Sequence, residues 1–201
     1  MLKFKLTSAQ IFLCLCIRHC DYLEKDKIKQ MYYSIGDEFL FSQAKLNGVS
    51  SIIGHTLSIV LGKDNVPSHW LEEYEEINER VTSYMNELEK VARLLDQNNI
   101  QLLALKNSGI SKGLYPYYGS CPMGDIDVLV SKLVFRRAHA ILTEAGYKLK
   151  FRSEFEEENI EDAERGGGAE YSVTLENGEH LWLELQWRPV AGRWIQPEQE
   201  P

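Results

Sequence analysis

The chain has 201 residues, a length that suits one large domain or two small ones with a sizeable buried core. Its 22 Lys and Arg residues against 30 Asp and Glu residues give a formal net charge of −8. This acidic balance, without a basic run, argues against non-specific nucleic-acid binding, which depends on Lys and Arg contacts to phosphates. A local basic pocket for one nucleotide is still compatible with it.

The N-terminal segment raises the question of a secretion signal. A short apolar run, residues 11–17, follows two lysines, but Arg18 comes directly after it and no small-residue cleavage site follows. The sequence Thr7-Ser8-Ala9-Gln10 instead matches a helix capping box, so a packed helix is expected there. No stretch of the sequence is long enough to span a membrane.

The four cysteines have spacings that do not suit a zinc site. Zinc sites use paired Cys-x-x-Cys or Cys/His spacings, which are absent around Cys14, Cys16, Cys20 and Cys121. We interpret these residues as free thiols, of which buried ones behave as small apolar side chains. The matching expectation is a reducing compartment and a cytoplasmic location.

The first half of the chain is predicted to be helical, with breaks at glycine and asparagine residues. Three helices are expected over residues 8–33, 37–46 and 50–61. A longer helix opens at Pro67-Ser68 and ends near Asn98-Asn99. Its apolar residues recur every three or four positions, at Tyr74, Ile77, Val81, Tyr84, Leu88, Val91 and Leu95. This seam predicts a core face rather than a coiled-coil dimer interface, and the acidic residues between its members are expected to face solvent.

The second half of the chain changes to short apolar runs that are typical of strands. Strands are expected over residues 100–105, 126–130 and 147–151, with a short helix up to Gly113 and another from Ser131 to Gly146. Residues 154–168, acidic and then glycine-rich, are expected to form a loop, with or without a helical turn. Asn177-Gly178, between alternating runs at 171–175 and 180–187, predicts a β-hairpin.

These elements predict an α+β fold, with an N-terminal helical bundle followed by a mixed β-sheet and its flanking helices. We place the boundary so that residues 1–98 form the helical region and residues 99–201 the sheet-containing core. One continuous domain is the alternative.

Two carboxylates at the start of an apolar strand give the clearest chemical signal. Asp125 and Asp127 stand two residues apart in Gly124-Asp125-Ile126-Asp127-Val128-Leu129-Val130, so in a strand they project from the same face. Adjacent like charges repel, and a divalent cation with oxygen ligands is the usual way to neutralise them. Phosphoryl and nucleotidyl transfer often use two such ions. An acid pair held only by caps or water is the alternative.

A third carboxylate, Glu184, stands in the middle of the second hairpin strand. A glutamate at this position is disfavoured unless something there requires it. The alternation places Leu181, Leu183, Leu185 and Trp187 on one face and His180, Trp182, Glu184 and Gln186 on the other. If this strand lies beside the Asp-x-Asp strand, three carboxylates converge on one cation site. An exposed strand face is the alternative.

Several motifs follow one another in a recognisable order. They are Leu105-Lys106-Asn107-Ser108, Leu114-Tyr115-Pro116, Met123 to Val130, Ala145-Gly146-Tyr147 and Leu183-Glu184-Leu185-Gln186-Trp187. In this order they resemble the polymerase-β-like nucleotidyltransferase superfamily, and most closely the bacterial family of uncharacterised nucleotidyltransferases. The resemblance covers residues 88–187 well and implies a nucleotidyltransferase-type mixed sheet.

The resemblance also implies a reaction. Asp125, Asp127 and Glu184 would bind two Mg²⁺ ions that bridge a nucleoside triphosphate, with ATP as the expected nucleotide. Glu184 stands where the family has its third carboxylate, and would help to lower the pKa of an acceptor hydroxyl or act as its base. That hydroxyl attacks the α-phosphorus in line, and pyrophosphate leaves.

Nucleotide-binding residues follow from the same resemblance. Ser108 and the backbone amides of the turn that contains Asn107 would cradle the β- and γ-phosphates at a helix N-terminus. Lys106 or Lys112 would add positive charge. The predicted nucleotide-binding residues are therefore Lys106, Asn107, Ser108 and Lys112.

Three positions depart from the family pattern. Asn107 stands where the family turn usually has Gly, Cys121 where it often has Arg, and Gln186 where His often follows the third acid. Intact Asp125 and Asp127 favour a catalytic protein. Asn107 and Cys121 instead favour a non-catalytic binding module of the same fold that recruits a protein or peptide partner. The chain ends soon after the third acid, as expected of a short family member or of part of a longer protein.

The leading hypothesis is a Mg²⁺-dependent nucleotidyltransferase that moves a nucleoside monophosphate from an NTP to a hydroxyl. The acidic composition favours a small molecule or a protein side chain over nucleic acid as the acceptor. The binding module is the second hypothesis. A metal-dependent phosphohydrolase that uses the same acids on water is the third.

Overall fold

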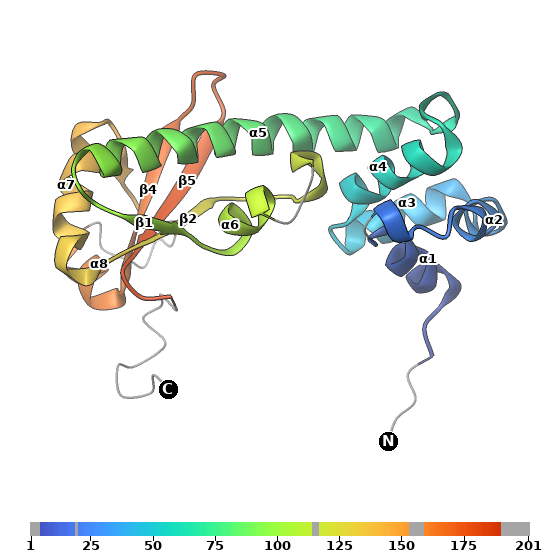
Figure 1. Ribbon diagram of the computed structural model, residues 1–201, viewed down its shortest axis with the longest axis horizontal. Coiled ribbons are helices and arrows are strands. Elements are labelled where there is room, and N and C mark those ends of the chain that lie inside the picture. Colours follow the sequence, from blue (N-terminus) through green and yellow to red (C-terminus); the bar gives the residue numbers. More distant parts are fainter. Residues whose placement is uncertain (1–4, 19, 114–116, 153–158, 190–201) are drawn as a thin grey trace. The chain divides into compact units, whose positions relative to one another are not determined.

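The computed structural model describes residues 5–18, 20–113, 117–152 and 159–189 (Figure 1). N-terminal helices are followed by a five-stranded mixed sheet with flanking helices, which confirms the predicted α+β fold class. The described residues cluster into two compact units, one within Met1–Val81 and Tyr115–Pro122, the other within Thr82–Leu114 and Met123–Pro201. The predicted domain boundary after residue 98 stays a prediction.

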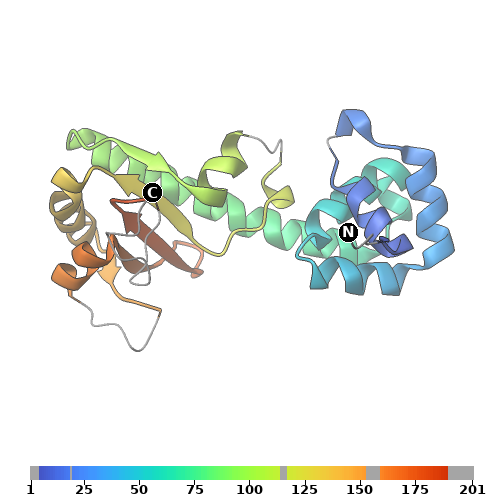
Figure 2. The ribbon, with the colours of Figure 1, turned by 90° about the horizontal axis from the view of Figure 1, so that it is seen from below.

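The first unit is helical. It contains α1 (Ser8–Cys16), α2 (Lys25–Ile35), α3 (Asp37–Leu46), α4 (Ser50–Leu61), the start of α5 (Ser68–Gln97) and the 3₁₀ turns η1 (Cys20–Tyr22), η2 (Lys63–Asn65) and η3 (Tyr118–Ser120). Figure 2 shows α1 to α4 packed together as a bundle. The predicted helices over residues 37–46 and 50–61 are confirmed. The capping box is also confirmed, since the Gln10 backbone N–H donates to the Thr7 hydroxyl.

The single helix predicted over residues 8–33 is wrong, because the chain turns between α1 and α2. The turn lets α1 and α2 pack against each other and against α4. Phe12 from α1 and Ile28 from α2 are both fully buried in the same core. One continuous helix would hold these two residues about 24 Å apart along its axis, at 1.5 Å per residue, and could not bury both in one small core.

An aspartate at the start of α3 links the helices of this unit. The Asp37 carboxylate accepts hydrogen bonds from the Tyr32 hydroxyl at 2.6 Å and from the Trp70 indole N–H at 2.7 Å. Trp70 is fully buried, and α4 approaches it so closely that a Cβ on Gly54 would lie 2.5 Å from the Trp70 carbonyl oxygen. Because glycine has no side chain, Gly54 permits this approach.

The second unit is built on a sheet with strand order β1-β2-β5-β4-β3. Its strands are β1 (Leu102–Ala104), β2 (Ile126–Val130), β3 (Lys148–Leu149), β4 (Gly168–Thr174) and β5 (His180–Gln186). β2 and β5 are parallel, and the other neighbours are antiparallel. The predicted hairpin is confirmed between β4 and β5, with Gly178 in a left-handed conformation at φ 85°.

Helices flank this sheet. They are the second half of α5, α6 (Lys106–Gly113), the 3₁₀ turn η4 (Lys132–Val134), α7 (Phe135–Glu144) and α8 (Ile160–Gly166). The second half of α5 runs along the sheet (Figure 1), and the Tyr84 hydroxyl donates to the His180 carbonyl at 3.4 Å. The predicted long helix is confirmed, and its seam is buried from Ile77 to Leu95. Residues 154–158 of the predicted acidic loop lie outside the described residues, and the rest of it contains α8.

The described cysteines behave as predicted from their spacing. Cys14, Cys16 and Cys121 are free thiols. Burial raises the pKa of Cys16 to about 12, which keeps this thiol neutral inside the helical core. Neither α5 nor any other helix within the described ranges combines the length and the apolar character that crossing a membrane requires.

Candidate active site

A row of carboxylates crosses one face of the sheet. The parallel register pairs Asp127 on β2 with Glu184 on β5, and the antiparallel register pairs Glu184 with Glu170 on β4. Directly opposed residues project from the same face of a sheet, so these three side chains share one face. Asp125 lies two residues before Asp127, at the entrance to β2. The register thus places carboxylates from three neighbouring strands side by side.

Lys106 bridges the first pair of these carboxylates. Its Nζ lies 2.6 Å from Oδ1 of Asp127 and 3.4 Å from Oε2 of Glu184. Burial lowers the pKa of Lys106, but the hydrogen bond to Asp127 and the charge of Glu184 outweigh that effect, so the pKa lies above its ordinary value. The ammonium group is therefore a permanent positive charge between two acids.

The turn that carries Lys106 has an unusual backbone. Lys106 has φ 47°, the left-handed conformation that glycine adopts at least cost. The position that departs from the family glycine, Asn107, is the next residue and lies in the first turn of α6. The left-handed residue in this turn is therefore Lys106, and a lysine held there despite the steric cost is a sign of function.

Arg152 bridges the second pair of carboxylates. Its Nη1 donates to Oδ2 of Asp125 at 2.7 Å, and its Nη2 lies 3.3 Å from Oε1 of Glu170. The backbone N–H of Arg152 also donates to Oε2 of Glu170 at 2.7 Å. The guanidinium carbon lies 5.7 Å from the centre of the Trp182 ring. Burial lowers the pKa of Arg152, but its bonds to Asp125 and Glu170 raise it overall.

Glu184 is the acid whose protonation is most strongly altered. Burial, with the hydrogen bond and the charge of Asp127, raises the pKa of Glu184 to about 7 against the opposing charge of Lys106. Asp127 is 2% exposed and its side chain contacts the same lysine. A carboxyl group with a pKa near 7 exchanges a proton readily at neutral pH, which suits a general base.

Two polar side chains hold Asp127 in place. The Asp127 backbone N–H donates to the hydroxyl of Ser108 at 2.9 Å, and Ser108 is buried. Nε2 of Gln186 donates to Oδ1 of Asp127 at 3.3 Å. Within the described residues, the buried Oε1 of Gln186 has no hydrogen-bond partner. Such an orphaned oxygen, next to the acids, is a potential ligand for a donor or a cation.

A family model for uncharacterised nucleotidyltransferases matches residues 34–201, which is most of the chain. The chain belongs to this nucleotidyltransferase family. No curated protein matches it. The matched range contains Asp125, Asp127 and Glu184, so the expectation drawn from the motifs is confirmed at the level of the family. The family implies an NTP substrate, and its acceptor is not known.

Nucleotidyltransferases typically use divalent metal ions, and this member offers the donor chemistry for them. Carboxylate oxygens are the ligands that Mg²⁺ prefers, and Asp125, Asp127 and Glu184 supply them from neighbouring strands. In the side-chain arrangement that the structure describes, however, no group of three or more acidic, His or Cys residues is set to hold a metal. Lys106 and Arg152 instead engage the acids in pairs. The carboxylates fit a divalent ion by their ligand chemistry.

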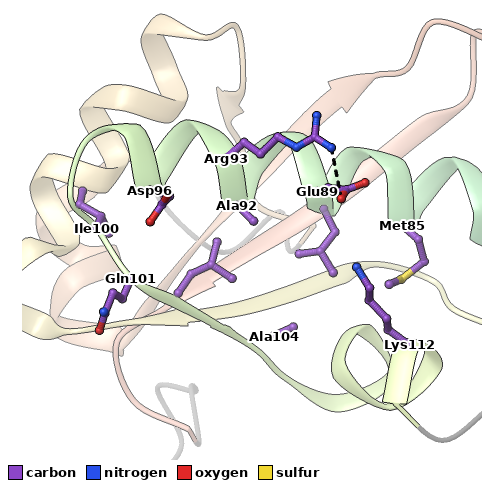
Figure 3. Close-up of a pocket in the computed structure, with 11 residues that line it drawn as sticks. Met85, Glu89, Ala92, Arg93, Asp96, Ile100, Gln101, Ala104 and Lys112 are labelled. Carbon is purple, nitrogen blue, oxygen red and sulfur yellow. Dashed lines mark ion pairs between the residues drawn. The ribbon is translucent and has the colours of Figure 1, made fainter.

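The structure does not bring Lys112 to the carboxylates. This residue lies at the far end of α6 and lines a groove of about 680 Å³ between α5 and β1 (Figure 3). Leu102 and Ala104 also line the groove, and their register partners Val130 and Val128 belong to the buried side of the sheet. The groove is therefore on the opposite face of the sheet from Asp127. Its remaining lining residues are Met85, Leu88, Glu89, Ala92, Arg93, Asp96, Ile100 and Gln101.

Sequence reasoning missed two residues of the site, Glu170 and Arg152. A signal for Glu170 was present, because Ala169, Tyr171 and Val173 alternate with polar residues and extend the predicted hairpin strand backwards. With that extension, the hairpin register would have placed Glu170 opposite Glu184. Arg152 follows the predicted strand over residues 147–151, and no local pattern marks it.

Proposed function

We propose that this protein is a Mg²⁺-dependent nucleotidyltransferase that moves a nucleoside monophosphate from an NTP to a hydroxyl group and releases pyrophosphate. The observation that carries the proposal is the parallel register that pairs Asp127 with Glu184, with Asp125 two residues away, in a member of a nucleotidyltransferase family. ATP is the nucleotide we expect first. The net charge of −8 favours a hydroxyl of a small molecule or a protein over nucleic acid.

The acids have distinct parts in this proposal. Asp125, Asp127 and Glu184 would hold two Mg²⁺ ions, which when bound neutralise the triphosphate and make the acceptor hydroxyl more acidic. Glu184 takes the proton from the acceptor hydroxyl. The hydroxyl oxygen then bonds to the α-phosphorus, the bond between the α-phosphorus and its bridging oxygen breaks, and pyrophosphate leaves.

The turn between β1 and α6 would bind the phosphates. Lys106 supplies a positive charge beside Asp127, and the backbone N–H groups of Asn107 and Ser108 belong to the first turn of α6, at the positive end of its helix dipole. Ser108 also fixes the backbone of Asp127. Gln186 orients the Asp127 carboxylate through its amide N–H. Lys106, Ser108 and Gln186 thus all contact Asp127, which is one of the proposed metal ligands.

A binding module of the same fold is the second candidate. The observation that favours it is that Lys106 and Arg152 already neutralise the acids in pairs. If these pairs persist when nucleotide and metal are supplied, the protein serves as a scaffold for a protein or peptide partner. The same experiment separates the two candidates.

Isothermal calorimetry with non-hydrolysable analogues of the four NTPs and Mg²⁺ tests the proposal. We expect metal-dependent binding by the natural sequence and its loss in the double variant Asp125→Asn/Asp127→Asn, which keeps the side-chain volumes. Asp96→Asn, an exposed acid in the groove behind the sheet, is the matched control and should bind normally. If folded natural protein binds none of the four analogues, the transferase proposal fails and the binding module is favoured.

A further inference from the structure

The second cation bridge, Asp125–Arg152–Glu170, is not explained by the predicted roles of the site residues. Asp125 is an expected metal ligand, yet its Oδ2 accepts a hydrogen bond from Arg152 at 2.7 Å. A divalent ion bound to the same carboxylate would repel this guanidinium, because the two are like charges close together. Metal binding at Asp125 therefore favours the departure of Arg152 from it.

Arg152 has a second attachment that would survive this change. The Arg152 backbone N–H donates to Oε2 of Glu170 at 2.7 Å, and the side chain reaches Oε1 of the same residue. Glu170 sits on β4, where it is paired with Glu184 on β5 and is fixed by the sheet. Glu170 therefore anchors Arg152 from the strand, whereas Asp125 contacts only its Nη1 group.

The group that metal binding would release has the chemistry of a phosphate ligand. A guanidinium presents a planar fork of N–H donors that suits phosphate oxygens and stays charged at all relevant pH values. Arg152 is partly exposed, with its guanidinium beside the face of Trp182, so the side chain is free to turn without entering the core. A released positive charge at this position complements an incoming triphosphate.

We propose that Arg152 is a triphosphate-binding residue, held on Asp125 in the absence of substrate and transferred to the nucleotide when metal takes that carboxylate. Glu170 is the positioning residue that keeps Arg152 at the site during the exchange. This inference rests on the proposed function and adds to it a residue and a sequence of events.

The proposed exchange predicts that one substitution changes the affinity for metal and the affinity for nucleotide in opposite directions. In Arg152→Gln, Mn²⁺ alone should bind more tightly than in the natural protein, by about threefold to tenfold, because its competitor at Asp125 is gone. The same variant should bind the NTP analogue at saturating metal about tenfold or more weakly, because a charged phosphate contact is lost. Arg152→Lys keeps the charge without the fork, and should preserve the weak Mn²⁺ binding but recover only part of the nucleotide affinity.

Arg136→Gln is the matched control. Arg136 also bridges two carboxylates, Glu161 and Glu164, and is similarly exposed, but it lies on α7 away from the acid row. Mn²⁺ binding followed by electron paramagnetic resonance and nucleotide binding followed by calorimetry should both be unchanged in this variant. A purely structural role for Arg152 would move both affinities in the same direction, or neither.

The outcomes also separate this inference from the proposed function. If the natural protein binds the analogue and Arg152→Gln binds it equally well, the inference is overturned while the transferase proposal stands. If Arg152→Gln binds Mn²⁺ more weakly than the natural protein, the competition at Asp125 is overturned. If the natural protein binds no nucleotide, both proposals fail together. Glu170→Gln should weaken nucleotide binding less than Arg152→Gln, since it loosens the anchor and leaves the guanidinium.

Discussion

The two faces of β2 and β5 differ in how their buried residues are stabilised. Ile126, Val128 and Leu183 are completely buried on one face and need only close packing. Asp127, on the other face, is 2% exposed, and it is stabilised by Lys106, Gln186 and the buried hydroxyl of Ser108.

The difference shows how one backbone register serves two purposes. The hydrogen-bonded ladder sets the distance between β2 and β5 and so how close Asp127 and Glu184 lie, while the apolar face holds both strands against the core. Like charges placed side by side reduce stability, which is a common cost of functional sites. Stability should therefore depend mainly on the apolar face, and activity on the charged face.

The largest expected effect is on the charged face. Asp127→Asn keeps the volume and removes a proposed metal ligand, so pyrophosphate release in the presence of NTP, Mg²⁺ and an acceptor should fall by about a thousandfold or more. The melting temperature should change little, because an amide can still meet Gln186 and Lys106. A variant that loses activity only by unfolding would contradict the separation of the two faces.

A substitution on the apolar face should do the reverse. Leu183→Ala leaves a cavity beside fully buried neighbours, and should reduce the free energy of unfolding by about 2–5 kcal/mol. Denaturant unfolding measures this, with Leu133→Ala as the control, since Leu133 is 96% exposed. Equal losses in the two variants would show that the packing of this face does not carry the stability of the sheet.

The pH dependence of stability tests the charged face without any substrate. The pKa of Glu184 is about 7 in the folded chain against an ordinary value of 4.5, so the folded state holds this proton more tightly. Its contribution to stability is fully present below pH 4.5 and is lost as the pH rises to about 7. Metal-free protein should therefore melt at a lower temperature at pH 8 than at pH 5. Glu184→Gln should show a smaller fall, and an equal or larger one would contradict the assignment.

The smallest expected effect is on nucleotide binding, from substitution of the lysines at the two ends of α6. Lys106 lies on the charged face and Lys112 in the groove behind the sheet. Lys106→Ala should weaken binding of the NTP analogue by about tenfold, the scale of a lost charged hydrogen bond, whereas Lys112→Ala should change it by less than about twofold. Calorimetry of both variants decides this. A larger loss in Lys112→Ala would support the predicted role of Lys112 as a nucleotide ligand instead.

Much of the fold could be predicted because its signals are local. Alternating residues in β5, the Asn177-Gly178 turn and the seam of α5 each depend on neighbours within a few positions. The break between α1 and α2 was missed because both segments favour helix, and only their shared core requires a turn.

The site could be predicted only in part for a related reason. Asp125 and Asp127 are marked by their own spacing, but the pairing of Asp127 with Glu184 joins strands 57 positions apart, and the resemblance to a family supplied it. Arg152 contacts Asp125 only because the fold brings the two residues together, and no local sequence pattern predicts this contact. The left-handed backbone of Lys106 gave no sequence signal, because lysine has no preference for that conformation.

The sheet has its shortest strands at its two edges. β1 has three residues and β3 has two, whereas β4 and β5, with seven each, lie inside the strand order. An exposed edge attracts another chain in proportion to the unpaired backbone that it offers, and very short edge strands offer little. The strand β5, which carries Glu184, is thus covered by β4 along its length and by β2 from Leu183 to Gln186, which should protect this strand against edge-to-edge pairing with another chain.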